Sequence, residues 1–240
     1  MASERVYLSG AVRTPIGRFG GSLAQHTAAE LGAVVAAESL RRTRIAPRDV
    51  QEVIWGSARQ AGLGPNVARQ IAYRADLPEE VPAYTVNQAC GSGLKAIILA
   101  AQEIMLGRAE VVLAGGVETM SRVPYLAEGV RWGMRMGHSQ LVDAMYRDGF
   151  LDPLSGMLMG ETAEKLAQLY EISREEQDQY ALRSQQRAAA AIESGRFAAE
   201  TVPIEIKGRK GETVLFARDE HPRPETTMEA LRRLPPGFAA

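Results

Sequence analysis

The first 120 residues alternate between short apolar runs and longer segments in which apolar residues recur every three or four positions. The short runs, which we predict as strands, are 5–12, 50–55, 81–86 and 110–115. The longer segments, at 27–42, 65–77 and 91–106, have the periodicity of helices. Strands that alternate with helices predict an α/β fold with a parallel sheet and helices on its faces.

The helix expected at 91–106 is apolar nearly all round. Its apolar residues are Leu94, Ala96, Ile97, Ile98, Leu99, Ala100, Ala101, Ile104 and Met105. Such a helix is typically buried on every side. It therefore implies a layer beyond a simple three-layer arrangement, and that layer need not belong to this chain.

The pattern changes after about residue 121. Residues 124–160 are rich in glycine and methionine with weak periodicity, which indicates a long loop region. A helix is expected at about 161–169. Ser173 and Glu176 form a capping-box pattern like that of Thr27 and Glu30, and this pattern predicts a second, long helix to Gly195. Residues 201–207 and 213–216 indicate a two-stranded ribbon, and the proline-containing tail shows no closing element.

Composition excludes several classes of function. The 240 residues include 28 Lys and Arg against 29 Asp and Glu, so no global basic field attracts nucleic acid or anionic lipid. No run approaches the ~18 apolar residues of a membrane span, and no secretory signal is visible at the start. We expect a cytoplasmic protein with neither a nucleic-acid nor a membrane partner. A single cysteine excludes an internal disulfide framework and a Cys-rich metal site.

That cysteine, Cys90, is the main candidate for chemistry. It lies between a predicted strand and the apolar helix, in the sequence Val-Asn-Gln-Ala-Cys-Gly-Ser-Gly of residues 86–93. A helix start favours the thiolate form, and flanking glycines let a substrate approach the backbone. The alternative is a small buried hydrophobic residue. The residues alone leave both interpretations open.

Two motifs carry a resemblance to a known family. Residues 86–95 (VNQACGSGLK) and 114–121 (AGGVETMS) resemble the N-terminal half of a thiolase. The similarity covers essentially the whole chain and includes residues 13–21, 148–153, 159–164 and 173–178.

The resemblance implies a fold. Thiolases have two similar halves stacked in five αβαβα layers. This chain would be the N-terminal half, with a mixed sheet that has helices on both faces and with an inserted α+β loop domain; the second half is absent. The implied domains are an N-terminal core at 1–122, which lacks its last strand, and a loop domain at 123–240 that binds coenzyme A and carries a tetramerisation loop.

The resemblance also implies a reaction, in which Cys90 is the nucleophile of an acyltransferase of fatty acid metabolism. The enzyme cleaves a 3-ketoacyl-CoA with free CoA, or condenses two molecules of acetyl-CoA into acetoacetyl-CoA. CoA is a substrate, with no tightly bound cofactor and no metal. Leu151 matches a residue of the CoA cleft, Met159 a methionine beside the acyl group, and Arg223 an arginine at the adenine-phosphate end. Leu158 and Ala230 depart from the family pattern, which leaves the chain-length preference open.

The catalytic histidine and the second cysteine of the family belong to the second half and do not occur here. The 240 residues alone are therefore expected to be inactive. One alternative is a non-catalytic remnant that binds CoA or a partner chain. Another is a ketoacyl synthase, which the 159–164 motif disfavours. Residues 124–142 align with the loop through which some thiolases form tetramers, so the resemblance implies a homo-oligomer, either a dimer or a tetramer.

Overall fold

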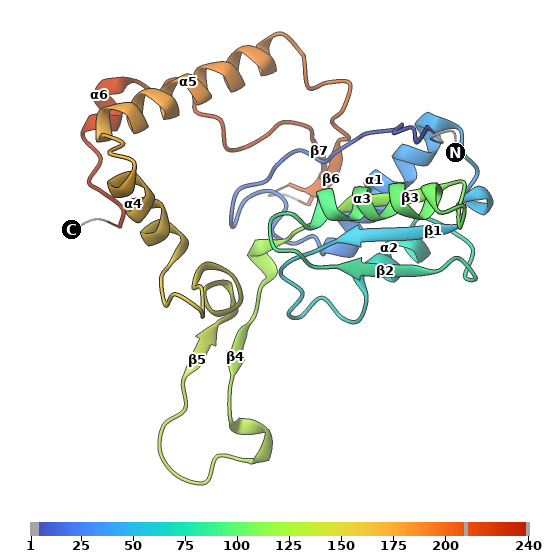
Figure 1. Cartoon of the computed structure of the whole chain (residues 1–240), viewed down its shortest axis with the longest axis horizontal. Coiled ribbons are helices and arrows are strands. Elements are labelled where there is room, and N and C mark those ends of the chain that lie inside the picture. Colours follow the sequence, from blue (N-terminus) through green and yellow to red (C-terminus); the bar gives the residue numbers. More distant parts are fainter. Residues whose placement is uncertain (1–4, 209–210, 239–240) are drawn as a thin grey trace.

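A three-stranded parallel sheet forms the centre of the N-terminal part. The computed structural model describes residues 5–208 and 211–238 (Figure 1). Strands β1 (Glu52–Gly56), β2 (Ala83–Val86) and β3 (Val112–Gly116) pair in the order β2-β1-β3. Both pairings are parallel. The predicted α/β architecture is thus confirmed, and within the described residues this sheet pairs only in parallel.

Helices cover both faces of the sheet, as the sequence predicts. Helices α1 (Ala28–Thr43) and α2 (Val67–Arg74) share one core with Val53 and Trp55 of β1. Helix α3 (Ser92–Met105) packs on the other face, where Ile54 meets Ala96 and Ala100. Successive side chains of a strand point to opposite faces, so β1 contributes to both cores.

Helix α3 is buried only on the side that faces the sheet. Ala96 is completely buried, whereas Leu94 is 64% exposed and Ile98 42% exposed. No described element covers the outer face of α3, so the further layer that this apolar helix implies is not among the described residues.

The strand predicted at residues 5–12 does not form. A cavity of about 390 Å³ separates this segment from β3, and α1 and α3 complete its lining. Because the cavity keeps the two backbones apart, residues 5–12 find no ladder partner, and Tyr7 and Leu8 are exposed. Only Arg13 forms a bridge, to Thr201.

In the C-terminal part, the β4–β5 hairpin and helices α4 to α6 extend away from this core, whereas β6 and β7 lie beside it (Figure 1). The helices of this part are α4 (Met159–Leu169), α5 (Arg174–Glu193) and α6 (Met228–Arg232). Its strands form two antiparallel pairs, β4 (Tyr125–Ala127) with β5 (Leu141–Asp143), and β6 (Ile204–Lys207) with β7 (Thr213–Phe216). Short helical turns lie at Pro47–Asp49, Met120–Arg122, Val130–Trp132 and Tyr146–Phe150.

Two expectations for this part need correction. Residues 124–160 contain the β4–β5 hairpin and two helical turns, and these elements of three to five residues each are too short to produce a periodic pattern. The tail does contain a closing helix, α6, capped by Thr227. The predicted ribbon of β6 and β7 is confirmed.

The predicted capping boxes of α1 and α5 are confirmed. Glu30 N–H donates to Thr27 Oγ1 at 3.2 Å, and Thr27 N–H donates to the Glu30 carboxylate at 2.8 Å. The same reciprocal pair joins Ser173 and Glu176. No described helix is both long enough and apolar enough to cross a membrane. The domain boundary at 122/123 stays a prediction.

Candidate functional site

Cys90 lies in the turn that joins β2 to α3, directly before Gly91, the N-cap of α3. The first turn of α3 rests against the ends of β1 and β3. A Cβ on Gly56 would overlap the backbone of Ser92, and a Cβ on Gly116 would lie 3.0 Å from the Gly93 Cα. Glycine therefore permits the contact that places Cys90 at the carboxyl edge of the parallel sheet, where α/β proteins bind their ligands.

Side chains on both sides of the turn hold Cys90 in place. Ala89 has a φ of +49°, which is unusual for a residue other than glycine. Ser92 Oγ accepts a hydrogen bond from Gln88 N–H at 2.8 Å and donates to the Ala89 carbonyl at 2.6 Å. Asn87 Oδ1 accepts from Ala89 N–H at 3.0 Å. The surrounding structure thus fixes a sparsely populated conformation next to the cysteine, a feature typical of functional sites.

Cys90 is exposed. Within the described chain Cys90 is therefore not a buried packing residue, and its role as nucleophile stays a prediction. In residues 5–208 and 211–238, no hydrogen bond reaches its sulfur.

Among the described residues, none of the three histidines forms a hydrogen bond with Cys90. His138 and His221 are exposed. His26 is half-buried, and its Nε2 lies 3.2 Å from the Glu205 carbonyl oxygen.

The structure brings Leu151 and Met159 close together. Leu151 bridges to Leu158, the residue before Met159, and Asp152 N–H donates to the Met157 carbonyl at 2.9 Å. Met159 begins α4, two residues before the predicted start. Both side chains are partly exposed, at 39% and 52%. We call these two apolar residues, which neighbour each other through the Leu151–Leu158 bridge, the apolar corner.

Arg223 lies on a separate segment, 217–227, which connects β7 to α6. Its side chain is exposed, and its backbone N–H donates to Gln185 Oε1 of α5 at 2.7 Å. In the part of the chain that the structure describes, no hydrogen bond or ion pair joins Arg223 to Cys90. The predicted site residues therefore lie on three separate segments.

The first end of the Arg223 segment is held by Asp219 and Glu220. Arg13 binds Asp219 at 2.8 Å and Glu200 at 2.6 Å. Asp219 also accepts from Ile16 N–H at 2.7 Å, and Glu220 accepts from Ser22 Oγ at 2.6 Å. We call this arrangement the carboxylate clasp. Burial acts to raise the pKa of both carboxyl groups, but their donors outweigh it and hold each pKa below its usual value.

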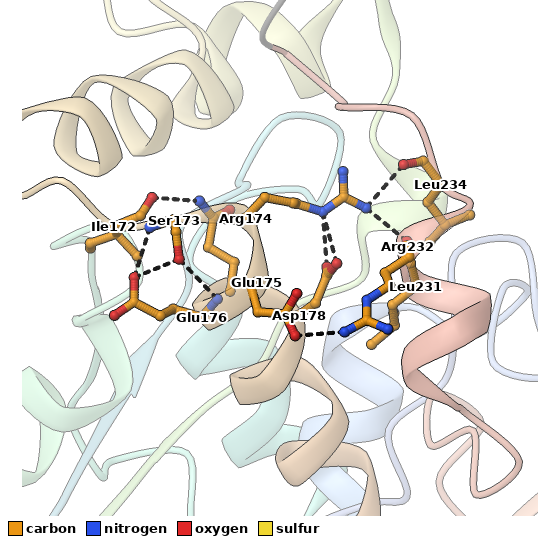
Figure 2. A network of polar contacts seen from close by, with 10 residues as sticks. Ile172, Ser173, Arg174, Glu175, Glu176, Asp178, Leu231, Arg232 and Leu234 are labelled. Carbon is orange, nitrogen blue, oxygen red and sulfur yellow. Dashed lines mark hydrogen bonds and ion pairs between the residues drawn. The ribbon is translucent and has the colours of Figure 1, made fainter.

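The other end of the segment is held by α6, which is anchored on the start of α5 (Figure 2). Arg174 Nη2 donates to the carbonyls of Leu231 at 2.7 Å and Leu234 at 2.9 Å, while its Nε binds Asp178 at 3.0 Å. Arg232 binds Glu175 at 2.7 Å. Because α6 ends in this network, both ends of the segment that carries Arg223 are fixed.

Sequence reasoning missed the supports of the site. Ser92 follows a strand and begins a helix, a place where serine commonly bonds nearby backbone, so its role could have been foreseen. The carboxylate clasp has no such local signal, because Arg13 and Asp219 are 206 positions apart. Among the described residues, no group of three or more His, Cys, Asp and Glu side chains is arranged to hold a metal ion.

Comparison with known proteins identifies the family. The family model "Thiolase, N-terminal domain" matches residues 6–240. The chain belongs to the thiolase family. It is 52% identical over 235 residues to an acetyl-CoA acetyltransferase of Pseudomonas aeruginosa and 48% identical over 238 residues to one of Syntrophomonas wolfei. Each alignment covers 98% of this chain but 60% of the relative, so this thiolase sequence spans about three fifths of those proteins.

Solved thiolase structures share the fold. The crystal structure of an acetyl-CoA acetyltransferase from Bacillus anthracis matches with a TM-score of 0.92 and 46% identity, covering 97% of this chain and 58% of that one. Human mitochondrial 3-ketoacyl-CoA thiolase matches with a TM-score of 0.90 and 41% identity, covering 95% and 58%. The thiolase-like N-terminal half is therefore confirmed as the fold.

The carboxylate clasp predicts a pH dependence. The pKa of the Asp219 and Glu220 carboxyl groups is lower in the folded protein than in the unfolded chain, where it is about 4. The clasp therefore stabilises the protein fully above that unfolded pKa. Its contribution is lost as pH falls through the folded pKa. In the complete protein, Asp219→Asn should lower the free energy of unfolding at pH 7 by about 1–3 kcal/mol, as expected for a hydrogen-bonded charge. Urea denaturation between pH 7 and pH 3 measures this.

The difference from wild type should shrink toward pH 3. Asp49→Asn is the control, since Asp49 is exposed and lies 3.9 Å from Arg48. A difference for Asp219→Asn that stays constant from pH 7 to pH 3 would contradict the role of its charge.

Proposed function

We propose that the complete protein is an acyltransferase that forms a thioester on Cys90. It cleaves a 3-ketoacyl-CoA with free CoA, or condenses two molecules of acetyl-CoA into acetoacetyl-CoA. The observation that carries the proposal is the exposed Cys90 at the start of α3, in a chain about half identical to relatives named acetyl-CoA acetyltransferase.

In the cleavage direction, the Cys90 thiolate attacks the keto carbon of the substrate. The bond between the keto carbon and the α-carbon breaks, and the α-carbon takes a proton as acetyl-CoA leaves. The thiol of free CoA then loses its proton and attacks the thioester, which releases acyl-CoA and restores the thiolate. The backbone N–H of Cys90 contributes to holding the thioester oxygen at the helix start. The family resemblance implies that a histidine of the second half of the protein transfers these protons. We therefore expect no catalytic turnover from residues 1–240 alone.

The loop domain supplies the contacts to CoA, which binds as a substrate and not as a resident cofactor. Leu151 and Met159 provide the apolar corner for the pantetheine and acyl portions. Arg223 is exposed on a segment that is fixed at both ends, and a guanidinium binds phosphate well. We assign it to the nucleotide end of CoA.

Acylation of Cys90 tests the reaction directly. The complete protein incubated with acetyl-CoA should gain one acetyl group on the peptide that contains Cys90, and Cys90→Ala should abolish both the adduct and turnover. Mass spectrometry of the digested protein locates the group. Binding of CoA without any acetylation would favour the non-catalytic alternative, and acetylation that persists in Cys90→Ala would exclude Cys90 as the nucleophile.

Arg223 should affect binding and not chemistry. A charge that holds the distant end of CoA binds the ground state and the transition state alike, so Arg223→Ala should raise the KM for CoA about tenfold with little change in kcat. Steady-state kinetics of the complete protein measure both constants. Arg183→Ala, on the exposed surface of α5 beside Tyr180, is the control. A large loss of kcat at constant KM would contradict the assignment.

We also propose that the complete protein is a homo-oligomer that uses the β4–β5 hairpin. The hairpin projects from the body of the chain (Figure 1), and Trp132 and Met136 at its end are 89% and 99% exposed. Exposed apolar side chains gathered in this way mark interaction surfaces. Light scattering should show a tetramer for wild type and a smaller assembly for Trp132→Glu. An unchanged mass would contradict this use of the hairpin.

A further inference from the structure

We propose that Glu118 is a positioning residue for Cys90, acting through the backbone of residues 58–59 and the side chain of Asn87. The inference rests on the proposed function, because it assigns to Glu118 the placement of the proposed nucleophile. Glu118 itself has no contact with the cysteine among the described residues.

The Glu118 carboxylate joins the ends of two neighbouring strands. It follows β3 by two residues, and it binds the loop that follows β1. Its Oε2 accepts from Ala58 N–H at 2.9 Å, and its Oε1 accepts from Arg59 N–H at 3.0 Å. Both carboxylate oxygens are therefore committed to backbone donors, which fixes the path of this loop.

The loop in turn holds the residue that shapes the Cys90 turn. Asn87 Nδ2 donates to the Ala58 carbonyl at 3.2 Å, while Asn87 Oδ1 accepts from Ala89 N–H at 3.0 Å. An unbroken path of polar contacts thus leads from Glu118 through Ala58 and Asn87 to Ala89, the residue with positive φ before Cys90. Moving Ala58 moves the amide that stabilises this turn.

The surroundings make these hydrogen bonds effective. Glu118, Ala58 and Arg59 are half-buried, and their neighbours Ser57 and Thr119 are 1% and 8% exposed. Hydrogen bonds to a carboxylate are stronger than neutral ones, and low local polarity strengthens them further. A carboxylate held in this way restricts the loop more than a surface contact would.

The side chain of Arg59, whose backbone binds Glu118, makes a separate contact with residues 148–150. The Arg59 guanidinium lies 5.4 Å from the centre of the Phe150 ring, and its Nη1 donates to the Asp148 carbonyl at 3.4 Å. Gly149 leaves the room for this contact, since a Cβ there would overlap the guanidinium. Phe150 directly precedes Leu151, and because the guanidinium makes this contact without the Glu118 carboxylate, loss of the carboxylate is expected to leave the apolar corner in place.

The experiment uses the complete protein and measures Cys90 directly. Glu118→Gln keeps the shape of the side chain but places an NH₂ group opposite one of the two N–H donors. Glu118→Asp keeps the charge but shortens the reach. Glu103→Gln is the matched control, because Glu103 lies near the far end of α3 and bonds Arg108. Iodoacetamide alkylation of Cys90 is followed against pH, together with kcat, the KM for CoA and the melting temperature.

Both Glu118 variants should lower the limiting alkylation rate and kcat by about 10- to 100-fold, as expected when a reacting group is misplaced by a fraction of an ångström to 1 Å. The pH at half-maximal alkylation and the KM for CoA should stay at the wild-type values, and Glu103→Gln should behave as wild type. The positioning role would be overturned if Glu118→Gln shifted the pH at half-maximal alkylation while Glu118→Asp kept the wild-type rate and midpoint. That result would show that the charge of Glu118 acts on the thiolate.

Asn87→Ala provides the second test, because it removes the link between Ala58 and Ala89. The double variant combines Glu118→Gln with Asn87→Ala. If Glu118 acts through Asn87, its limiting alkylation rate should be no lower than that of Asn87→Ala alone. If the losses of alkylation rate in the two single variants multiply in the double variant, the pathway through Asn87 is overturned. It is also overturned if Glu118→Gln unfolds while Asn87→Ala stays folded. Alkylation does not require acyl transfer, so absence of a Cys90 acetyl adduct would reject the proposed function while this series still decides the role of Glu118.

Discussion

The close contact between the first turn of α3 and the ends of β1 and β3 is the constraint on which the site depends. Gly56 and Gly116 leave no side chain between the strands and the helix, so backbone meets backbone. The helix start can therefore lie at the sheet edge only in a narrow range of positions. The contact fixes the position of the turn that contains Cys90. The hydrogen bonds of Asn87 and Ser92 then fix the conformation of that turn.

Polar contacts hold the segment that carries Arg223 against the N-terminal residues. The Arg223 segment is tied to the N-terminal residues by Arg13, Asp219 and Glu220. Carboxylates that accept from several donors specify orientation more sharply than apolar contacts, which are not directional. Apolar packing thus builds the sheet and its helices, while charged groups add directional contacts between the N-terminal residues and the Arg223 segment.

The sequence predicted the elements whose signals are local. Thr27 with Glu30 and Ser173 with Glu176 marked the starts of two helices, because a capping box involves residues only three positions apart. Residues 5–12 have the composition of a strand but form none, because a strand also needs a partner at ladder distance, which depends on distant residues. For the same reason Cys90 could be found from its neighbours, whereas Arg13 with Asp219 and Glu118 with Ala58 could not.

The outer face of α3 links the fold to the reactivity of Cys90. The partial charge at a helix start acts strongly where water is excluded and weakly where solvent screens it. Within the described residues Leu94 and Ile98 are exposed on this helix, so solvent reaches its first two turns. Covering that apolar face would bury Leu94 and lower the local polarity around the N-terminal end of α3. The same burial that stabilises the helix would then strengthen the electrostatic effect of its N-terminal end, beside which Cys90 lies, so packing and electrostatics are coupled through one element.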